Sequence, residues 1–348
     1  MNRTAVLYAL ASAALFGIST PAAKVIVSAV DPIVLAGLLY CGAGIGVTIL
    51  RHLGQAVLPP TGQALQREDM PWLAAAIGAG GIAGPILLMT GLTRTDAAAS
   101  SLLLTLEGAA TALMAWFIFH ENFDRRVAIG MICLVAGAAT LAWSGTPTLA
   151  GVIGPIAIVG ACVMWGLDNN LTRKVSLADP LQIVQLKGLI AGPVNVALGL
   201  WAGASLPGVF DALLAAIVGF LGYGVSLALF IVALRHLGTA RTGAYFSTAP
   251  FLGAIVAVAG LGEPVTAQLL LAGSMMGLGV WLHLTEWHEH EHIHQPMTHT
   301  HSHVHDEHHQ HRHNAEDPPA VPHTHPHVHG WLKHKHAHTP DMHHEHRH

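Results

Sequence analysis

Charged residues are scarce in this chain: Asp, Glu, Lys and Arg make up 10% of its 348 residues, whereas hydrophobic residues make up 52%. A chain with so few charges cannot cover a soluble core with polar surface, and it offers no basic face to nucleic acid. The composition therefore excludes a soluble enzyme built around one large core, and it excludes a nucleic-acid-binding protein.

Cysteine is also scarce, with only Cys41, Cys133 and Cys162. All three lie in apolar runs, where cysteine usually serves as a small buried side chain. Their number and placement exclude a disulfide-stapled secreted domain. We expect all three side chains to be buried.

Histidine is nearly missing from residues 1–282, which contain only His52, His120 and His236, and the other 24 of the 27 histidines follow. The charge balance changes at the same place. Residues 1–282 hold 12 basic and 11 acidic side chains, whereas residues 283–348 hold 4 basic and 9 acidic ones. The chain therefore joins two chemically different segments, an apolar body and a polar, histidine-rich tail.

The apolar body contains ten runs long enough to cross a membrane, because a helix needs about 20 apolar residues per crossing. The first run is too long for the apolar region of a signal peptide and continues past Pro21 and Lys24, so we treat it as retained. The sequence predicts an all-α integral membrane protein with ten transmembrane helices. They span about 4–28, 32–50, 71–92, 96–119, 126–144, 149–172, 180–203, 211–234, 239–260 and 265–285.

The basic residues predict the orientation of these spans, because Lys and Arg are retained on the cytoplasmic side. With the N-terminus inside, the outer connections carry only Lys24 and Arg94. We therefore predict that both termini are cytoplasmic. The inner connections carry Arg3, Arg51, Arg67, Arg125, Arg126, Arg173, Lys174, Arg235 and Arg241.

The two halves of the body resemble each other. Residues 27–32, Val-Ser-Ala-Val-Asp-Pro, match residues 175–180, Val-Ser-Leu-Ala-Asp-Pro, and residues 92–113 match 234–255 at an offset that also carries Glu121 onto Glu263. Five spans per half is an odd number, so the two repeats must cross the membrane in opposite directions. Such inverted repeats are typical of secondary transporters, whose substrate site lies near the bilayer midplane between the halves. Chance similarity between apolar segments is the alternative interpretation.

A family resemblance rests on one stretch of the first half. Residues 99–107, Ala-Ser-Ser-Leu-Leu-Leu-Thr-Leu-Glu, continue through Ala115-Trp116 and His120-Glu121 to the run Gly130–Gly137. This stretch resembles the fourth and fifth spans of EamA-type members of the drug/metabolite transporter superfamily. The resemblance covers about residues 4–285 and implies ten spans in two repeats.

The second half repeats the motif. Residues 242–250, followed by Gly262-Glu263-Pro264, resemble the same family motif in its second copy. One departure is visible, because the family often has Glu-Pro here, whereas Glu107 is followed by Gly108 and Pro250 follows Ala249. The two elements are split between the halves. The resemblance implies a transporter, an exporter in direction, of a small metabolite or drug-like solute.

Three ionisable residues stand out within the predicted spans, where a charge costs about 2.5–3.5 kcal/mol on insertion scales: Glu107, Asp168 and Lys187. Glu107 could bind a cation or a proton, or it could be a hydrogen-bonded packing element. Lys187 needs a carboxylate partner, Glu107 or Asp168, or a water-filled cavity; the alternative is that its ammonium group reaches the inner interface. These residues are our first substrate-pathway candidates.

Aromatic residues supply the remaining candidates. Trp165 and Asp168 are three residues apart, hence on one helical face, and could line a cavity. The alternative is that Trp165 anchors the span at the interface and that Asp168 lies at its wet end. Tyr245 is the further candidate. We interpret the glycine groups at 42–46 and 78–84 as close helix packing.

The tail contains runs of alternating histidine, separated by acidic residues and prolines. It has few large apolar residues, so we expect residues 286–348 to be disordered. Imidazoles are ligands for Zn, Ni, Co and Cu ions, and we expect a divalent transition metal to bind the tail. The expected metal ligands are His288, His290, His292, His294, His299, His301, His303, His305, His323, His325, His327 and His329.

These observations give three regions: a first five-helix repeat (1–145), a second (146–285) and the tail (286–348). The favoured interpretation is a transporter in the cell inner membrane that works by alternating access. The transporter lies in the lipid bilayer, acts on a small-molecule substrate and requires no cofactor. The tail buffers metal or regulates transport. Efflux of a divalent metal fed by the tail is one alternative, and a non-transporting metal sensor is another. A homodimer is left open.

Overall fold

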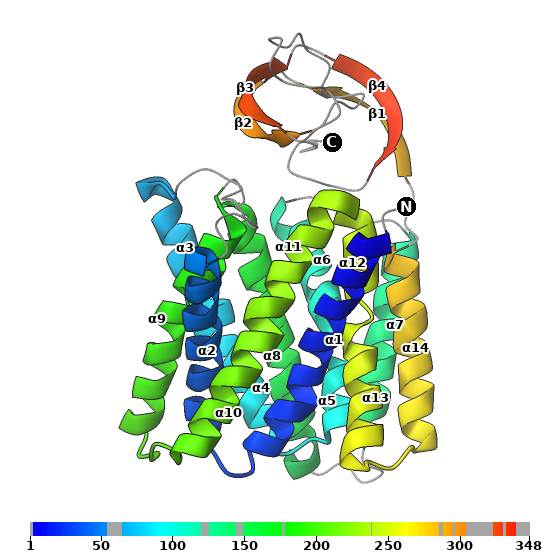
Figure 1. The fold of residues 1–348 in the computed structure, drawn as a ribbon. Coiled ribbons are helices and arrows are strands. Elements are labelled where there is room, and N and C mark those ends of the chain that lie inside the picture. Colours follow the sequence, from blue (N-terminus) through cyan, green and yellow to red (C-terminus); the bar gives the residue numbers. More distant parts are fainter. Residues whose placement is uncertain are drawn as a thin grey trace.

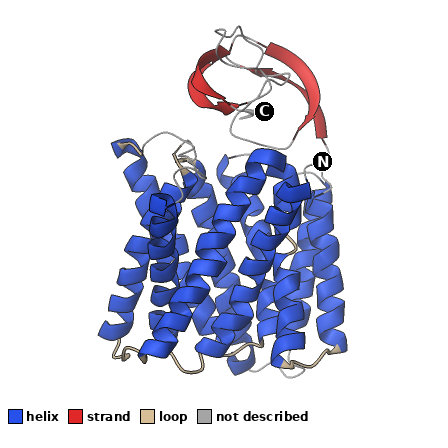
Figure 2. Cartoon of the chain, in the orientation of Figure 1, coloured by secondary structure: helices blue, strands red, loops and turns tan. Residues whose placement is uncertain are grey.

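The computed structural model is a bundle of long helices that share one approximate axis, with four short strands beyond one end (Figures 1 and 2). The helix α1 begins, and the last helix α14 ends, at that same end of the bundle (Figure 1). The structure describes residues 3–53, 65–119, 125–143, 149–175, 178–237, 239–284, 288–294, 297–303, 323–329 and 332–338. His120, Glu121 and His305 lie outside these ranges.

The first half of the body contains the elements up to α7. They are α1 (Arg3–Ile26), α2 (Pro32–Leu53), η1 (Arg67–Asp69), α3 (Met70–Ala76), η2 (Ile77–Ala83), α4 (Gly84–Leu92), α5 (Ala97–Leu103), α6 (Leu106–Phe119) and α7 (Arg125–Ala142). The second half contains α8 (Leu149–Arg173), α9 (Pro180–Trp201), α10 (Val209–Gly219), η3 (Phe220–Val225), α11 (Ser226–Leu237), α12 (Thr239–Phe246), α13 (Ala249–Leu261) and α14 (Ala267–Leu284). Both η2 and η3 are π-helical.

Eight helical segments of the described chain are long and apolar enough to cross a membrane, and two shorter apolar helices, Ala249–Leu261 and Ala267–His283, follow them. Many large apolar side chains point away from the protein, among them Trp201 at 87% exposure and Ile132 at 67%. Surfaces of this kind are stable against lipid and not against water. The multi-pass membrane protein expected from the sequence is confirmed at this level.

An aspartate followed by a proline begins α2 and α9. Asp31 Oδ1 accepts the backbone N–H groups of Ile33 and Val34 at 2.9 and 3.2 Å, and Asp179 Oδ1 accepts that of Leu181 at 3.1 Å. The carboxylate satisfies donors that have no partner within the helix, and proline fits the first helical position. The repeated Asp-Pro of the sequence is therefore a repeated helix start.

The two halves interleave. Helix α1 of the first half packs against α11 and α13 of the second, and α8 of the second half packs against α4 and α6 of the first. In addition, α2 packs along α9, and α7 packs along α14, on opposite sides of the bundle (Figure 1). Each half therefore surrounds the first helix of the other, which brings residues of both halves to the centre of the bundle.

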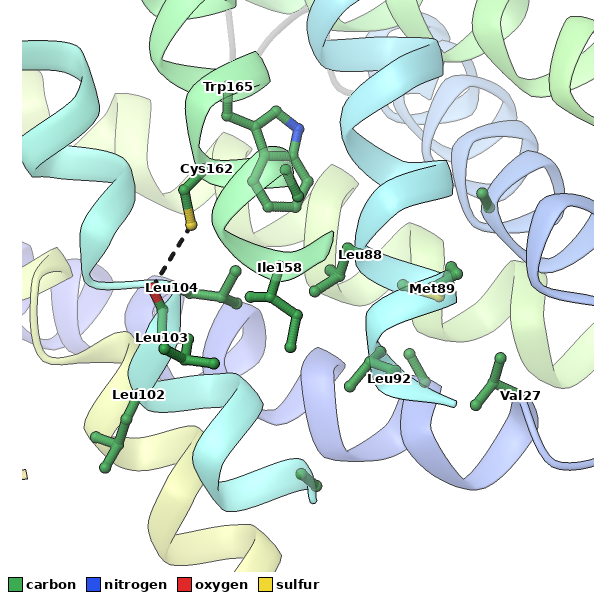
Figure 3. Packing of buried hydrophobic residues seen from close by; sticks show 14 of the residues in the cluster. Val27, Leu88, Met89, Leu92, Leu102, Leu103, Leu104, Ile158, Cys162 and Trp165 are labelled. Atoms are coloured by element: carbon green, nitrogen blue, oxygen red, sulfur yellow. Dashed lines mark hydrogen bonds between the residues drawn. The ribbon is translucent and has the colours of Figure 1, made fainter. Parts of the chain in front are cut away.

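Two of the predicted spans differ from the expectation of one continuous helix. The span predicted at 96–119 breaks after Leu103, and the one at 239–260 breaks after Phe246. At the first break the Cys162 thiol lies 3.5 Å from the Leu103 carbonyl oxygen, over a core that includes Ile158 and Leu88 (Figure 3). Glu107 therefore lies in the first turn of α6 and not in the middle of a helix.

The cysteine prediction is only partly correct. Cys162 is buried, whereas Cys41 and Cys133 are half-buried, and none of the three is in a disulfide. The reason for the difference is that an apolar run in a membrane protein has lipid-facing positions as well as core positions. An apolar neighbourhood in the sequence therefore does not imply burial inside the protein.

The close packing predicted for the glycine groups is confirmed at most positions. A Cβ atom on Gly42 would lie 2.1 Å from the carbonyl oxygen of Ala216, and one on Gly44 would lie 2.6 Å from the backbone nitrogen of Leu189. Gly78 is the exception, because a Cβ atom there would meet nothing within 4 Å. Glycine thus lets α2 approach the backbones of α9 and α10 closely.

The tail contains the strands β1 (His288–His294), β2 (Met297–His303), β3 (His323–His329) and β4 (Leu332–His338). β1 pairs with β4 and β2 with β3, both antiparallel. Histidine alternating with residues such as Thr, Ile and Val has the two-residue period of a strand. An isolated pair of strands is only marginally stable in water, so disorder of the tail in solution stays a prediction.

Candidate functional site

A cavity of about 230 Å³ lies in the middle of the bundle, with walls from both halves. It is closer to the end of the bundle where α1 begins. Helix α2 ends and α9 begins at this end, and Lys187, which lines the cavity, lies only two turns into α9. The cavity is lined by Phe16, Tyr40, Ala43, Glu107, Trp165, Asp168, Asn169, Val184, Lys187, Gly188, Gly222, Tyr223, Ser226, Leu227 and Phe246.

Four of the five substrate-pathway candidates meet in this cavity. Glu107, Trp165, Asp168 and Lys187 all line it. Tyr245 is not among the residues that line the cavity, whereas its neighbour Phe246 is.

Lys187 and Asp168 form an ion pair inside the body. The Lys187 ammonium lies 2.5 Å from Asp168 Oδ1, and the two side chains are 15% and 10% exposed. Thr172 completes the group, because its hydroxyl accepts from Lys187 at 3.0 Å and donates to Asp168 at 2.9 Å. Lys187 therefore does not extend to the interface, and its partner is Asp168 and not Glu107.

Glu107 is held by an amide and not by a cation. Glu107 Oε1 accepts a hydrogen bond from Asn169 Nδ2 at 3.0 Å, and the same Nδ2 is 3.1 Å from the Thr111 hydroxyl. Within the described part of the chain, no ammonium or guanidinium group is paired with this carboxylate. Glu107 is thus the acidic group of the cavity whose charge has no matching positive charge.

Two carbonyl groups of the π-helix η2 accept hydrogen bonds from side chains. The Gly84 N–H donates to Ala79, five residues earlier, so the next carbonyl, that of Gly80, faces Pro85, which has no N–H. Trp165 Nε1 and the Tyr40 hydroxyl donate to the Gly80 oxygen at 2.9 and 2.8 Å. Trp165 is 8% exposed, so it is a fixed wall of the cavity and not an interfacial anchor.

Gly80 also supports Asp168. A Cβ atom at this position would lie 1.9 Å from Asp168 Oδ2, so only glycine leaves room for the carboxylate. The next carbonyl, that of Gly81, accepts from the buried Asn195 amide at 2.9 Å. The glycine-rich π-helix therefore combines close packing with polar contacts to the site.

Aromatic rings form a continuous line along the cavity. Tyr40 and Tyr223 have ring centroids 5.9 Å apart, Tyr223 and Phe16 5.8 Å, and Phe16 and Phe246 5.3 Å. Such tilted and edge-to-face contacts are favourable arrangements for aromatic pairs. Together with Trp165 they make the wall largely apolar around the three charged groups.

Sequence reasoning missed several of these residues. Asn169, Phe16, Tyr40 and Tyr223 line the cavity but were not candidates. Asn169 had a usable signal, because it follows Asp168 within a predicted span. The aromatic residues had a weaker one: they make up 6% of the chain, which is rare enough for a cluster to be informative once the helices are placed.

At the far end of the bundle, the connection between α4 and α5 is held from both sides. The Lys24 ammonium donates to the carbonyl oxygens of Leu92 and Thr95 at 2.5 and 2.7 Å. The Glu263 carboxylate accepts from the N–H groups of Ala97 and Ala98 at 2.7 and 2.8 Å. We call this arrangement of Lys24, Glu263 and residues 92–98 the clasp. It links the first half to the loop before α14.

At the opposite end, an ion pair joins the end of α2 to the start of α9. Arg51 Nη2 lies 3.0 Å from Asp179 Oδ2, and Arg51 Nη1 lies 3.1 Å from Gln185 Oε1. Because α2 begins at Asp31 and ends here, while α9 begins here, the two Asp-Pro helix starts lie at opposite ends of the bundle.

Metal ligands do not gather in the described helices. Among the residues that the structure describes, no group of three or more His, Cys, Asp or Glu side chains is placed to hold a metal ion. In the tail, the backbone register pairs His288, His290 and His292 with His338, His336 and His334.

The chain is similar to a known protein family, to a protein from another organism and to solved structures. The EamA-like transporter family matches residues 3–143 and again residues 152–285. A protein of Methanothermobacter thermautotrophicus described as an uncharacterized transporter is 27% identical over 281 residues, which is 77% of this chain and 82% of that one. A solved crystal structure, described only as that of a protein, is 18% identical with a TM-score of 0.60 and covers 81% of this chain and 96% of its own. The last likeness concerns the fold alone.

Proposed function

Because this chain belongs to the EamA-like transporter family and is a multi-pass membrane transporter, we propose that it moves a small organic solute by alternating access. The observation that carries the proposal is the cavity lined from both halves, which holds Glu107, Asp168 and Lys187 within an apolar body. Ionisable groups in a membrane are costly and mark substrate or ion pathways.

We further propose ten crossings in two inverted five-helix repeats. Three observations support this architecture. The family matches the chain twice. The π-helices η2 and η3, and the breaks after α5 and α12, occur at corresponding places in the two halves. The Asp-Pro helix starts lie at opposite ends of the bundle, as inversion requires.

We propose that the protein lies in the inner membrane of the cell with both termini in the cytoplasm. The reason is the excess of basic residues in the connections on the side of the termini. In this orientation the cavity lies nearer the cytoplasm and the clasp closes the outer end. The arrangement fits a state that loads solute from the cytoplasm, which agrees with the export direction implied by the family.

For the tail we propose binding of divalent transition metals by its alternating histidines, as a buffer or regulator outside the solute pathway. Neutral imidazole is a good ligand for Zn, Ni, Co and Cu ions. The dense histidine runs all follow the last membrane helix. In this proposal the metal sites of the tail lie outside the solute pathway.

The test of the proposed function is solute release from proteoliposomes. Liposomes containing the purified protein are loaded with a defined pool of small metabolites, and the released solutes are identified by mass spectrometry. We expect selective release that is lost in both Lys187→Met and Glu107→Gln, while both variants remain folded. No selective release of any solute would contradict the proposal.

Divalent metal efflux is the second candidate, favoured by the histidine runs next to the last helix. It predicts that a strain lacking the gene is sensitive to Ni, Co, Zn or Cu, and that only the complete chain restores resistance. We expect instead that a chain ending at Thr285 behaves as the complete one does in solute export. Metal sensitivity that depends on both the tail and Glu107 would favour metal efflux.

A further inference from the structure

The charges of the cavity do not balance. Its described lining residues include two carboxylates, Glu107 and Asp168, and one ammonium group, Lys187. Asp168 and Lys187 cancel each other in a contact of 2.5 Å. With all three groups ionised, the cavity carries the single negative charge of Glu107.

A ligand that binds to Lys187 or Asp168 has to break their ion pair, which costs free energy. Lys187, Asp168 and Thr172 form a closed triangle in which each side chain contacts the other two. A ligand carboxylate that captured Lys187 would leave Asp168 without its cation in an apolar setting. Breaking a buried pair by removing one partner is strongly destabilising. Anions and zwitterions are therefore disfavoured.

Glu107 is different, because its carboxylate contacts only the neutral amide of Asn169. Asn169 is exposed to the cavity, and its amide also contacts Thr111. A ligand cation can approach Glu107 without separating an existing ion pair. It gains a charge-assisted contact in surroundings of low dielectric constant, where such a contact is strong.

The aromatic wall favours the same kind of ligand. Five aromatic residues, Phe16, Tyr40, Trp165, Tyr223 and Phe246, line the cavity. Aromatic faces attract cations through the ring quadrupole and also bury apolar groups. A hydrated inorganic ion would gain little from these rings, whereas an organic cation uses both properties.

From the charge balance, the closed ion pair and the aromatic wall, we propose that the solute of this transporter is a small monovalent organic cation, an amine or ammonium compound with an apolar or aromatic body. Glu107 binds the positive group, and the aromatic wall covers the body. This inference rests on the proposed function, since it names the substrate class of the same cavity.

The test compares four compounds with the same aromatic ring and similar size but different charge. They are 2-phenylethylammonium, neutral 2-phenylethanol, anionic 3-phenylpropionate and zwitterionic phenylalanine. Binding to the purified complete chain is measured by isothermal titration calorimetry. We expect the cation to bind at least about tenfold more tightly than the neutral compound, and the anion to bind most weakly.

Two variants shift this preference in opposite directions. Glu107→Gln removes the unmatched charge, so the advantage of the cation over the neutral compound is expected to disappear. Lys187→Met frees the Asp168 carboxylate, so the cation is expected to bind more tightly than to the parent. Glu68→Gln replaces an exposed carboxylate outside the cavity and serves as the matched control, with unchanged binding. A role in folding alone would not produce opposite shifts.

Equal binding of the cation and the neutral compound, or tighter binding of phenylalanine or of the anion, would overturn the inference. Loss of 2-phenylethylammonium binding in Lys187→Met would also overturn it. The proposed function has a separate test: release of an anion or a zwitterion from proteoliposomes would refute only the substrate class. Tight binding of the cation without release of any solute would leave the site intact and refute transport.

Discussion

The two halves of the helical body share their irregular backbone features but not their charges. Each contains a π-helix and, in the following membrane helix, a break. Glu107 follows the first break, whereas Ala249 and Pro250 follow the second. The ion pair between Asp168 and Lys187 belongs to the second half alone. The backbone geometry is repeated, and the chemistry is divided between the copies.

The contacts beneath the two π-helices show the same contrast. Gly80 of η2 lies against the carboxylate of Asp168, and Gly222 of η3 lies against the side chain of Ser19. Both glycines make room for a side chain of the other half, but only one of these side chains is charged. In the mechanism that we propose, the repeated scaffold provides two alternating conformations and one set of charges serves the solute.

The largest expected effect is at the first break. Glu107→Gln removes the unmatched charge, and we expect the rate of solute release to fall at least about 100-fold, a loss of about 2.7 kcal/mol. Pro250→Ala, at the corresponding break of the second half, removes no charge, and we expect a loss below about tenfold. Comparable losses in the two variants would mean that the charges are not divided as we describe.

The next effect concerns the π-helices. In Gly80→Ala the added methyl group collides with Asp168, and we expect overpacking of about 1–3 kcal/mol and a transport loss of about tenfold or more. Gly222→Ala is expected to cost similar stability with a smaller transport loss, because Ser19 carries no charge. Gly78→Ala, in the same π-helix as Gly80 but in open space, is the control. Thermal unfolding and solute release of the three variants test this order.

The sequence allows much of the scaffold to be predicted. Apolar runs and the repeated Asp-Pro indicate where the helices lie and begin, because burial in lipid and end capping are local requirements. The breaks after Leu103 and Phe246 were not predicted, since they depend on contacts between the halves. A hydrophobic run looks the same whether the helix within it is continuous or broken.

The part of the site that could be predicted comprises its three charged residues and Trp165. Glu107, Asp168 and Lys187 stand out because ionisable residues are rare in membrane spans. Which of the two carboxylates pairs with Lys187 depends on how α8 packs near α9, and no sequence spacing contains that information. Phe246 lines the cavity, whereas its neighbour Tyr245, the residue named from the sequence, does not.

A smaller effect is expected at the clasp, which in our account closes the outer end. Glu263→Gln weakens the bonds to Ala97 and Ala98, and Lys24→Met removes those to Leu92 and Thr95. Charge-assisted bonds of this kind contribute about 1.5–3 kcal/mol. We expect the outward-open state to become more populated and a cysteine at Ser226 to react faster with an external maleimide, in a background without native cysteines. An unchanged or lower rate would contradict this role of the clasp.

The smallest effect on transport is expected from the tail. A chain ending at Thr285 should export solute as the complete chain does but bind far fewer Zn or Ni ions, as measured by metal analysis after dialysis. Metal binding requires neutral imidazole, whose reference pKa is about 6.5, so binding by the complete chain should be present near pH 7.5 and lost as the pH falls below 6.5. Equal metal content of both chains, or binding unaffected by low pH, would contradict the prediction.

The most direct test of the central claim, that the cavity faces the two sides of the membrane in turn, is the accessibility of Asn169, which is exposed to the cavity. A single cysteine at this position, in a protein whose Cys41, Cys133 and Cys162 are replaced, is exposed to a membrane-impermeant maleimide in right-side-out and in inside-out vesicles. We expect labelling from both sides, and faster labelling from the cytoplasmic side. When Glu263 and Lys24 are intact and a bound solute fills the cavity, we expect labelling from both sides to be blocked. Labelling from one side only, under all conditions, would contradict alternating access through this cavity.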